Sequence, residues 1–340
     1  MPRKSYDEIK TKFAQFVETW KTKNAEALNN LATEEVACRI SSSPGSNDSL
    51  DKLAGLKEFV ATYPKTDELQ LAIYSYACNF NETEAQQIAH VVCESLNYVE
   101  GKEELDAFYY GINCANHWVK TDSGWKMDEV HMDVYPFYWT VDSIYDYFKE
   151  TWYLGSKLAI PQEDGRLPAV EGEFDLPWDR VPDGIDVLTE EEKLKECYAK
   201  LFFSADYMVS ENRIITRSKH MGMNTSRYGE YDGIRSMVGS VRYKRQKDRY
   251  WAHPFRFGKN LYMNEEKTYA ICDVYRVFGW KQRNHEYVWT RENVGIEHMC
   301  MGGWQEFVKE DGVWRVAAGN SKLGIYEVGP YSETYYGDMI

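Results

Sequence analysis

The sequence predicts an α+β protein made of two similar halves, each with helices followed by a long curved antiparallel sheet. A hairpin sequence occurs twice, as WVKTDSGWKM at 118–127 and as FVKEDGVWRV at 307–316. Each half also begins with an amphipathic helical pattern and continues into alternating strand patterns. The spacing of the two copies is too long for a solenoid repeat, so we interpret the chain as a domain duplication.

The first half, residues 1–150, opens with an apolar stripe at helical spacing from Ile9 to Trp20. A short helical segment at 25–32 and a helix from Gly55 follow. The turn DSG separates the last two of four strand patterns, which predicts a hairpin. The four strand patterns lie at 71–80, 85–99, 108–120 and 125–137.

The second half, residues 189–332, repeats this order. Thr189 and Glu192 form a capping-box pattern at the start of its first helix. A helix from Gly233 and three strand patterns follow, at 267–278, 297–309 and 314–328. Residues 151–188 contain four prolines within 161–184 and many acids, and we expect them to form a linker.

Composition excludes several classes of protein. The formal net charge of −14 argues against nucleic-acid binding, and we interpret the basic stretch at 242–249 as a solvated loop. Seven scattered cysteines without CxxC pairs favour a reducing, cytoplasmic location and no metal site. Neither a signal peptide nor a membrane-spanning run is expected. A nucleotide-binding glycine motif is also missing, and we expect no cofactor.

The order of elements resembles the SnoaL-like branch of the nuclear transport factor 2-like superfamily, in tandem. The first helix, the stretch YGEYDGIRSMV at 228–238 and the Trp-containing hairpin carry this resemblance, over roughly 5–140 and 189–330. The resemblance implies two cone-shaped domains, each a sheet wrapped around about three helices that enclose an apolar pocket. It also implies pairing through the sheets, hence an internal pseudo-dimer of the two copies and possible further homo-oligomers.

Two residues of the second half are candidates for acid–base chemistry. Asp206 ends the apolar face of the first helix, and His253 stands between aromatic residues before a proline. In bile-acid-dehydratase-like members of the family, an Asp of the first helix and a His near this strand form the catalytic pair. Asp206 and His253 match those places, and a His titrates near neutral pH. A solvated helix acid and a hydrogen-bonded turn residue are the alternative interpretations.

The resemblance is incomplete. Leu201 and Phe202 stand near the place of a family Tyr, while Phe278 and Gly324 fall near the places of an acid and an Arg. Asp273 or Lys322 are possible substitutes. Four residues are candidates for substrate binding, although Asp273 fits a partner-facing position equally and His298 fits a structural sheet histidine. These four are Tyr207, Asp273, Tyr275 and His298.

The first half departs further from the family pattern. Lys21 stands where the second half has Asp206, and its histidines His90, His117 and His131 lie on later strands. We therefore expect the first half to be structural or to bind a different ligand. Any activity is assigned to the second half.

The leading hypothesis is a cofactor-independent lyase (dehydratase) or isomerase that transfers a proton on a hydrophobic ring-containing molecule. Steroid-, bile-acid- and polyketide-like compounds belong to this class, and a polyketide-cyclase-like enzyme is a third option. The alternative is a non-catalytic module for hydrophobic-ligand binding or dimerisation. Neither hypothesis involves nucleic acid or a membrane.

Overall fold

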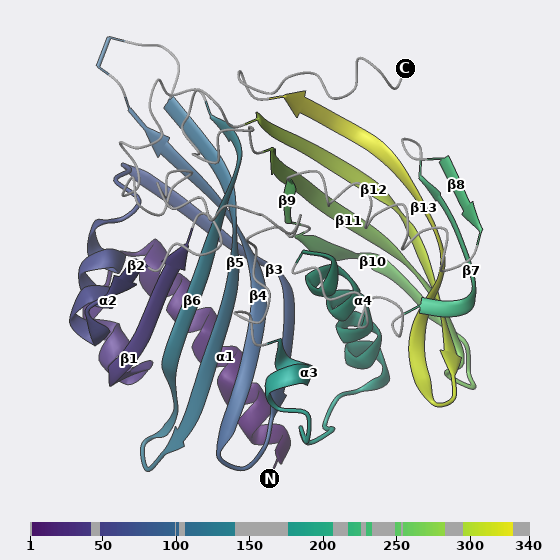
Figure 1. The fold of residues 1–340 in the computed structure, drawn as a ribbon, viewed down its shortest axis with the longest axis horizontal. Coiled ribbons are helices and arrows are strands. Elements are labelled where there is room, and N and C mark those ends of the chain that lie inside the picture. Colours follow the sequence, from purple (N-terminus) through teal and green to yellow (C-terminus); the bar gives the residue numbers. More distant parts are fainter. Residues whose placement is uncertain are drawn as a thin grey trace, which may run out of the picture. The chain divides into compact units, whose positions relative to one another are not determined.

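A computed structural model describes most of the chain. Its described residues divide into two compact units, one formed by 2–139 with 176–187 and the other by residues from 188 onward. Each unit contains one sheet whose long strands are visibly bent (Figure 1). The described residues are 2–41, 48–98, 100–101, 106–139, 176–206, 217–225, 229–232, 249–252, 254–282 and 295–328.

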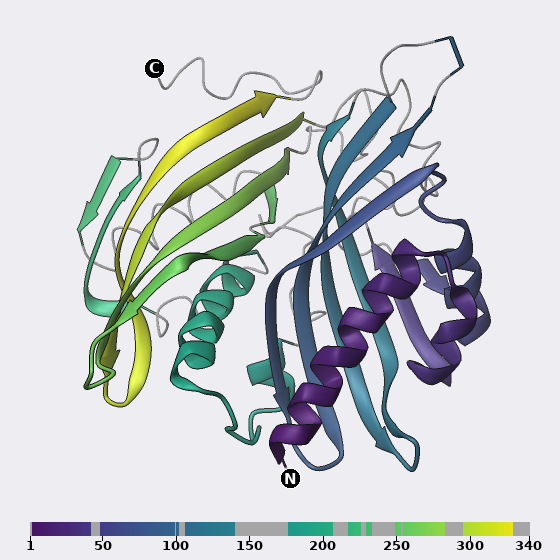
Figure 2. The ribbon, with the colours of Figure 1, turned by 180° about the vertical axis from the view of Figure 1, so that it is seen from behind.

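The first unit has a sheet with strand order β2-β1-β6-β5-β4-β3. Its strands pair antiparallel except for β1 and β6, which are parallel. The helix α1 crosses one face of this sheet (Figure 2). Its elements are α1 (Pro2–Lys21), the 3₁₀ helix η1 (Ala25–Asn30), β1 (Ala32–Ser41), β2 (Asp48–Leu50), α2 (Lys52–Thr62), β3 (Glu68–Phe80), β4 (Glu84–Asn97), β5 (Asp106–Thr121), β6 (Gly124–Trp139) and the short helix α3 (Pro177–Arg180).

The predicted apolar stripe is the face of α1 that packs on the sheet. Ile9, Phe13 and Phe16 are fully buried, and Trp20 contacts Phe59 of α2 with their ring centroids 5.3 Å apart. Burial of such side chains is a main source of the stability of the fold. The four predicted strand patterns of this half are confirmed as β3 to β6. The sequence patterns did not predict β1 and β2.

The second unit has a sheet with strand order β10-β11-β12-β13-β7-β8, and β9 also pairs with β11. The α+β class with antiparallel sheets is thereby confirmed, although β7 and β13 are parallel. The helix predicted from Gly233 lies outside the described residues. The elements of this unit are α4 (Glu190–Asp206), β7 (Arg217–Thr225), β8 (Gly229–Asp232), β9 (Arg249–Ala252), β10 (Phe255–Met263), β11 (Tyr269–Gln282), β12 (Gly295–Glu310) and β13 (Val313–Val328).

The capping box predicted before α4 is present. The backbone N–H of Glu192 donates to Oγ1 of Thr189 at 3.3 Å. In return, the backbone N–H of Thr189 donates to Oε2 of Glu192 at 2.9 Å. The two side chains therefore satisfy two N–H groups that the first turn of a helix leaves without helical partners.

The two repeated hairpins have the same register and the same irregularity. In the first, Lys120 pairs with Trp125, and the register shifts between His117 and Trp118. In the second, Lys309 pairs with Trp314, and the register shifts between Glu306 and Phe307, the equivalent position. A β-bulge bends its strand locally, so both hairpins bend at the same point.

The repeated hairpins also bind the first helix of their unit in the same way. The ammonium group of Lys120 lies 5.1 Å from the Trp125 ring centroid and 3.4 Å from a carboxylate oxygen of Glu8 in α1. The ammonium group of Lys309 lies 5.6 Å from the Trp314 ring centroid and 2.6 Å from Glu190 in α4. The Lys and Trp residues that both hairpins share therefore attach the first helix of each unit to its hairpin.

The end of the predicted linker packs on the first unit. Leu176 and Val181 are fully buried, and the N–H of Ile185 donates to the carbonyl of Phe80 at 2.8 Å. Arg180 of α3 forms an ion pair with Glu129 of β6 at 3.0 Å. Across the described residues, no helix is long and apolar enough to cross a membrane.

Candidate functional site

An aromatic cluster holds the start of β10 against the last turns of α4. The ring of Phe255 lies 4.7 Å from that of Tyr198, edge to face, and 5.8 Å from that of Phe202. Phe202 precedes Asp206 by one helical turn, and Phe255 follows His253 by two residues. The cluster therefore packs the start of β10, two residues after His253, against the half of α4 that ends at Asp206.

For the candidate pair Asp206 and His253, the structure describes the helix and strands that flank them. Asp206 is the last residue of α4, and α4 contacts β9, which ends at Ala252 directly before His253. The side chain of Asp206, and all of His253 and Tyr207, lie outside the described residues. Their projection into one pocket therefore stays a prediction.

Arg276 is a further polar residue beside this cluster. Its guanidinium carbon lies 5.3 Å from the centroid of the Phe202 ring, and its backbone pairs with Phe255. Arg276 follows the buried Cys272 and Val274 at two-residue spacing, which places it on the same face of the sheet, the face that packs on α4. A cation there favours the ionised form of any nearby carboxylate. Arg276 was not predicted as a site residue, because neither face of the β11 pattern is cleanly polar in sequence.

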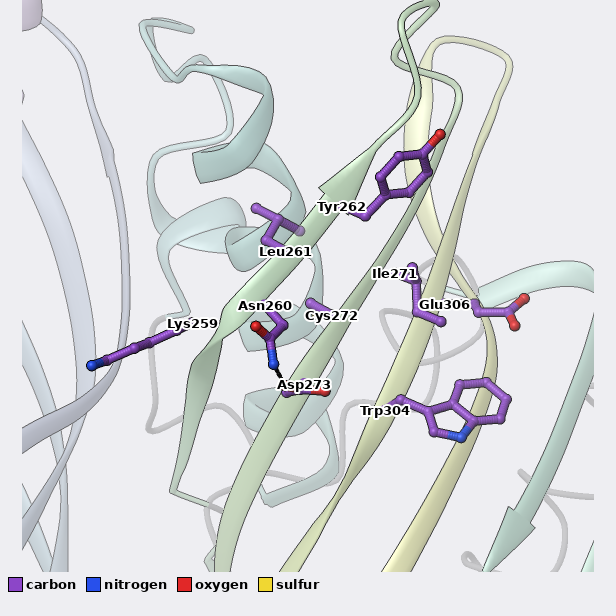
Figure 3. Close-up of a pocket in the computed structure, with 9 residues that line it drawn as sticks. All are labelled: Lys259, Asn260, Leu261, Tyr262, Ile271, Cys272, Asp273, Trp304 and Glu306. Atoms are coloured by element: carbon purple, nitrogen blue, oxygen red, sulfur yellow. Dashed lines mark hydrogen bonds between the residues drawn. The ribbon is translucent and has the colours of Figure 1, made fainter.

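Asp273 and Tyr275 lie on the other face of the same strand. Cys272 and Val274 are buried, whereas Tyr275 is 55% exposed. Asp273 lines an open groove of about 560 Å³ on that face (Figure 3). The structure therefore does not bring these two predicted substrate-binding residues together with the α4 end, because successive side chains of a strand point to opposite faces. If Asp273 and Tyr275 bind a ligand, they do so on a surface separate from the end of α4.

The remaining predicted binding residue, His298, is described only by its backbone. It lies on β12, where it pairs with Gly279 of β11 and with Glu327 of β13. Its assignment to a substrate site stays a prediction.

The helix-facing side of the first sheet is closely packed but contains polar groups. Trp118 and Trp125 are fully buried there, and Nδ2 of Asn116 donates to Oε1 of Gln87 at 2.9 Å. Lys21, the counterpart of Asp206, is the last residue of α1. The first unit therefore has a lysine where the second unit has the candidate catalytic carboxylate.

The histidines of the first unit share the opposite face of its sheet. His90 pairs with Asn113, and His131 pairs with Ala115, which lies two residues further along β5. His117 follows on the same face, with Nδ1 2.6 Å from Oδ1 of Asp128 and Nε2 3.2 Å from Glu84. Counting the register from the DSG turn would have paired His131 with Cys114 and placed it on the other face from His117. The register shift between His117 and Trp118 moves the pairing by one residue and brings both histidines to one face.

Burial governs the protonation of His131. Loss of solvent around the ring, with a smaller effect of the Arg39 charge, lowers the pKa of His131 from 6.5 to about 3. The neutral imidazole is therefore its form at neutral pH. Asn113, on the same face, is fully buried, and among the described residues neither the oxygen nor the nitrogen of its amide has a hydrogen-bond partner.

Comparisons with known proteins yield partial structural matches. No protein-family model matches the chain, and no curated protein matches it. The Kfla4162 protein from Kribbella flavida matches 39% of this chain and 91% of its own, at 17% identity and a TM-score of 0.36. A hexachlorocyclohexane dehydrochlorinase of type 2 matches 43% of this chain and 93% of its own, at 11% identity and a TM-score of 0.34.

A third solved structure has a similar extent of match. A ketosteroid isomerase-like protein from Erwinia carotovora atroseptica matches 39% of this chain and 95% of its own, at 7% identity and a TM-score of 0.32. Each of the three proteins thus corresponds, over nearly its whole length, to less than half of this chain. Within the described ranges, no group of His, Cys, Asp and Glu side chains is arranged to hold a metal ion.

Proposed function

We propose that the second unit is a cofactor-independent lyase or isomerase that transfers a proton on a hydrophobic, ring-containing small molecule. In this proposal His253 is the general base and Asp206 orients and charges it. Arg276 stabilises negative charge that develops on the substrate oxygen or keeps Asp206 ionised.

The aromatic cluster is the observation that carries this proposal. Phe255 is only 2% exposed and contacts both Tyr198 and Phe202, so the segment that leads from His253 is fixed against α4. A base and its orienting acid need such a fixed framework, because proton transfer requires hydrogen-bond distances. Apolar walls also suit a substrate with rings.

The proposed reaction begins with removal of a proton. His253 takes the proton from an activated C–H group, such as one next to a carbonyl. The electron pair of the broken C–H bond stays on the substrate. In a lyase the electron pair then expels a hydroxyl group, which leaves as water after His253 returns the proton. In an isomerase the proton returns to a different carbon. Both outcomes balance without a cofactor.

Deuterium exchange tests the first step without knowledge of the product. We would incubate the protein in D₂O with a panel of steroid, bile-acid and polyketide-like ketones and follow exchange of the activated C–H by NMR. Wild type is expected to exchange at least one member. His253→Ala and Asp206→Asn are expected to lower the rate about 10²- to 10⁴-fold.

The control is Glu265→Gln, an exposed residue in the turn between β10 and β11, which should leave exchange unchanged. Melting temperatures close to wild type in all variants would show that the fold is intact. Exchange that persists in both His253→Ala and Asp206→Asn would reject the assignment. Ligand binding without exchange of any panel member would favour the non-catalytic alternative.

A further inference from the structure

The outer face of the second sheet, the face away from α4, exposes large aromatic side chains. Tyr262 is 61%, Tyr275 55% and Trp304 39% exposed, and all three lie on β10, β11 or β12. Within the described chain they are three of the five large hydrophobic residues that are exposed. Exposed aromatic residues gathered on one face indicate a binding surface.

The groove on this face combines two aromatic rings, Tyr262 and Trp304, with two carboxylates. Asp273 pairs directly across the strands with Trp304, and Ile271 pairs with Glu306, two residues along β12. Side chains paired this way share a face, so Trp304 has Asp273 opposite it and Glu306 beside it. Figure 3 shows Ile271 between Tyr262 at one end of the groove and Trp304 at the other.

The two carboxylates have neutral hydrogen-bond donors. Nδ2 of Asn260 donates to Oδ2 of Asp273 at 2.6 Å, and the hydroxyl of Tyr269 forms a hydrogen bond with Glu306. Within the described residues, neither carboxylate forms an ion pair with Lys or Arg. Lys259 belongs to the lining, but its ammonium group points away from the other residues (Figure 3).

We propose that this groove binds an organic amine with an apolar body. The ammonium group would lie over the Trp304 ring, where the negative face of the indole attracts cations, between Asp273 and Glu306. The apolar body would lie on Ile271 and reach Tyr262. Anionic ligands are repelled by both carboxylates, while a neutral ligand gains only the apolar contact.

This site is separate from the proposed acid–base centre. Asp273 and Trp304 lie on the outer face, whereas Arg276 and the aromatic cluster lie on the face toward α4. Arg256, which pairs with Tyr275, is also on the outer face but does not line the groove. Binding of an amine can therefore be tested whether or not the second unit transfers protons.

A matched pair of ligands isolates the charge. By calorimetry at pH 7 and low salt, we would titrate the protein with 2-phenylethylamine, which is protonated, and with 2-phenylethanol, which is neutral and of the same size. The amine is expected to bind at least about tenfold more tightly, since it alone gains the cation–ring and carboxylate attractions. Raising the salt concentration should reduce this difference.

Variants locate the site. Asp273→Asn, Glu306→Gln and Trp304→Leu should each weaken amine binding up to about fivefold, as expected for exposed charge and ring contacts. The double variant of Asp273 and Glu306 should bring the amine close to the alcohol. Glu265→Gln is the control and should bind as wild type.

Four outcomes would overturn the proposal. Equal binding of the amine and the alcohol would show an apolar groove without charge recognition. Binding of glucose or cellobiose that exceeds binding of the amine would show a saccharide site. Undetectable binding of the amine at about 10 mM, or binding unchanged in all three variants, would show that the groove is not an amine site.

Discussion

The outer faces of the two sheets differ at equivalent positions. In the first unit His90, Asn113 and His117 occupy this face and are buried. The matching positions of the second unit hold Tyr275, Gly302 and Glu306, of which Tyr275 is largely exposed. Trp304, with a ring in the groove, stands where the first unit has the buried Ala115.

This difference separates what the architecture requires from what each unit can vary. Both hairpins keep the same bulge, and both keep the Lys–Trp–Glu contact with the first helix of the unit. The bulge fixes the bend of the sheet, and the Lys–Trp–Glu contact fixes the position of the first helix on it. The outer face has neither of these roles, and its residues differ between the units. The first unit has buried imidazoles and amides there, and the second has exposed rings and carboxylates.

The substitutions with the largest expected effect on stability test whether the two hairpin tryptophans are equivalent. Trp125 is fully buried and Trp314 is 3% exposed, while Trp304 on the outer face is 39% exposed. Trp125→Ala and Trp314→Ala should each lower the free energy of unfolding by about 3–5 kcal/mol, because both leave a cavity. Trp304→Ala should cost less than about 1 kcal/mol.

Urea unfolding followed by circular dichroism measures these free energies. If unfolding shows two steps, each hairpin variant should shift only the step of its own unit. A cost of 3 kcal/mol or more for Trp304→Ala would contradict the exposed placement of its ring. A negligible cost for either hairpin variant would break the equivalence of the two hairpins.

The second prediction concerns acid stability and is specific to the first unit. His131 has a pKa lowered from 6.5 to about 3, so the unfolded chain binds a proton below pH 6.5 that the folded state rejects until about pH 3. The free energy of unfolding should therefore fall as the pH falls through this window. Between pH 7 and pH 5 the loss from this group is about 2 kcal/mol.

His131→Gln removes this group and is the test. Urea unfolding at pH 7 and pH 5 should show a pH-dependent loss in the variant that is smaller than in wild type by about 2 kcal/mol. The comparison of slopes does not depend on whether the variant is less stable at pH 7. Equal slopes in wild type and variant would mean that His131 accepts a proton in the folded state.

Periodicity was sufficient to predict the elements that bury one regular face. The stripe from Ile9 to Trp20 became α1, and the Thr189–Glu192 capping box opens α4. The strands β1 and β7 were missed, because each pairs in parallel with a strand distant in sequence and carries no hairpin signal. Such pairings depend on tertiary contacts rather than on a local pattern.

The candidate site was predicted only in its backbone framework. The family resemblance placed Asp206 and His253 in one pocket, which stays a prediction. The described residues show that Phe255, two residues after His253, packs on Tyr198 and Phe202 of α4. Asp273 and Tyr275 were grouped with that end although alternation puts them on the other face from Arg276. Neither face of β11 is cleanly polar in sequence, so composition alone did not show which face α4 covers.

The smallest expected effects on the free energy of unfolding come from substitution of the two lysines of the repeated hairpins. Lys309 lies 2.6 Å from Glu190 and its side chain is 22% exposed, whereas Lys120 lies 3.4 Å from Glu8 and is 37% exposed. Glu8 also has Lys12 at 3.8 Å and the N–H of Trp125 at 3.0 Å. Lys309→Met should therefore cost about 1 kcal/mol and Lys120→Met less, about 0.5 kcal/mol.

The pH dependence identifies the ion pair as the cause. The hydrogen bond from Lys309 holds the pKa of Glu190 below its usual 4.5, against a smaller opposing effect of burial. This stabilisation is present above pH 4.5 and is lost as the pH falls through the folded pKa of Glu190. Unfolding experiments at a series of pH values below 7 should thus show that the difference between wild type and Lys309→Met shrinks as the pH falls below 4.5. A difference that does not shrink would instead assign the effect to contact of the lysine stem with Trp314, which does not depend on the charge of Glu190.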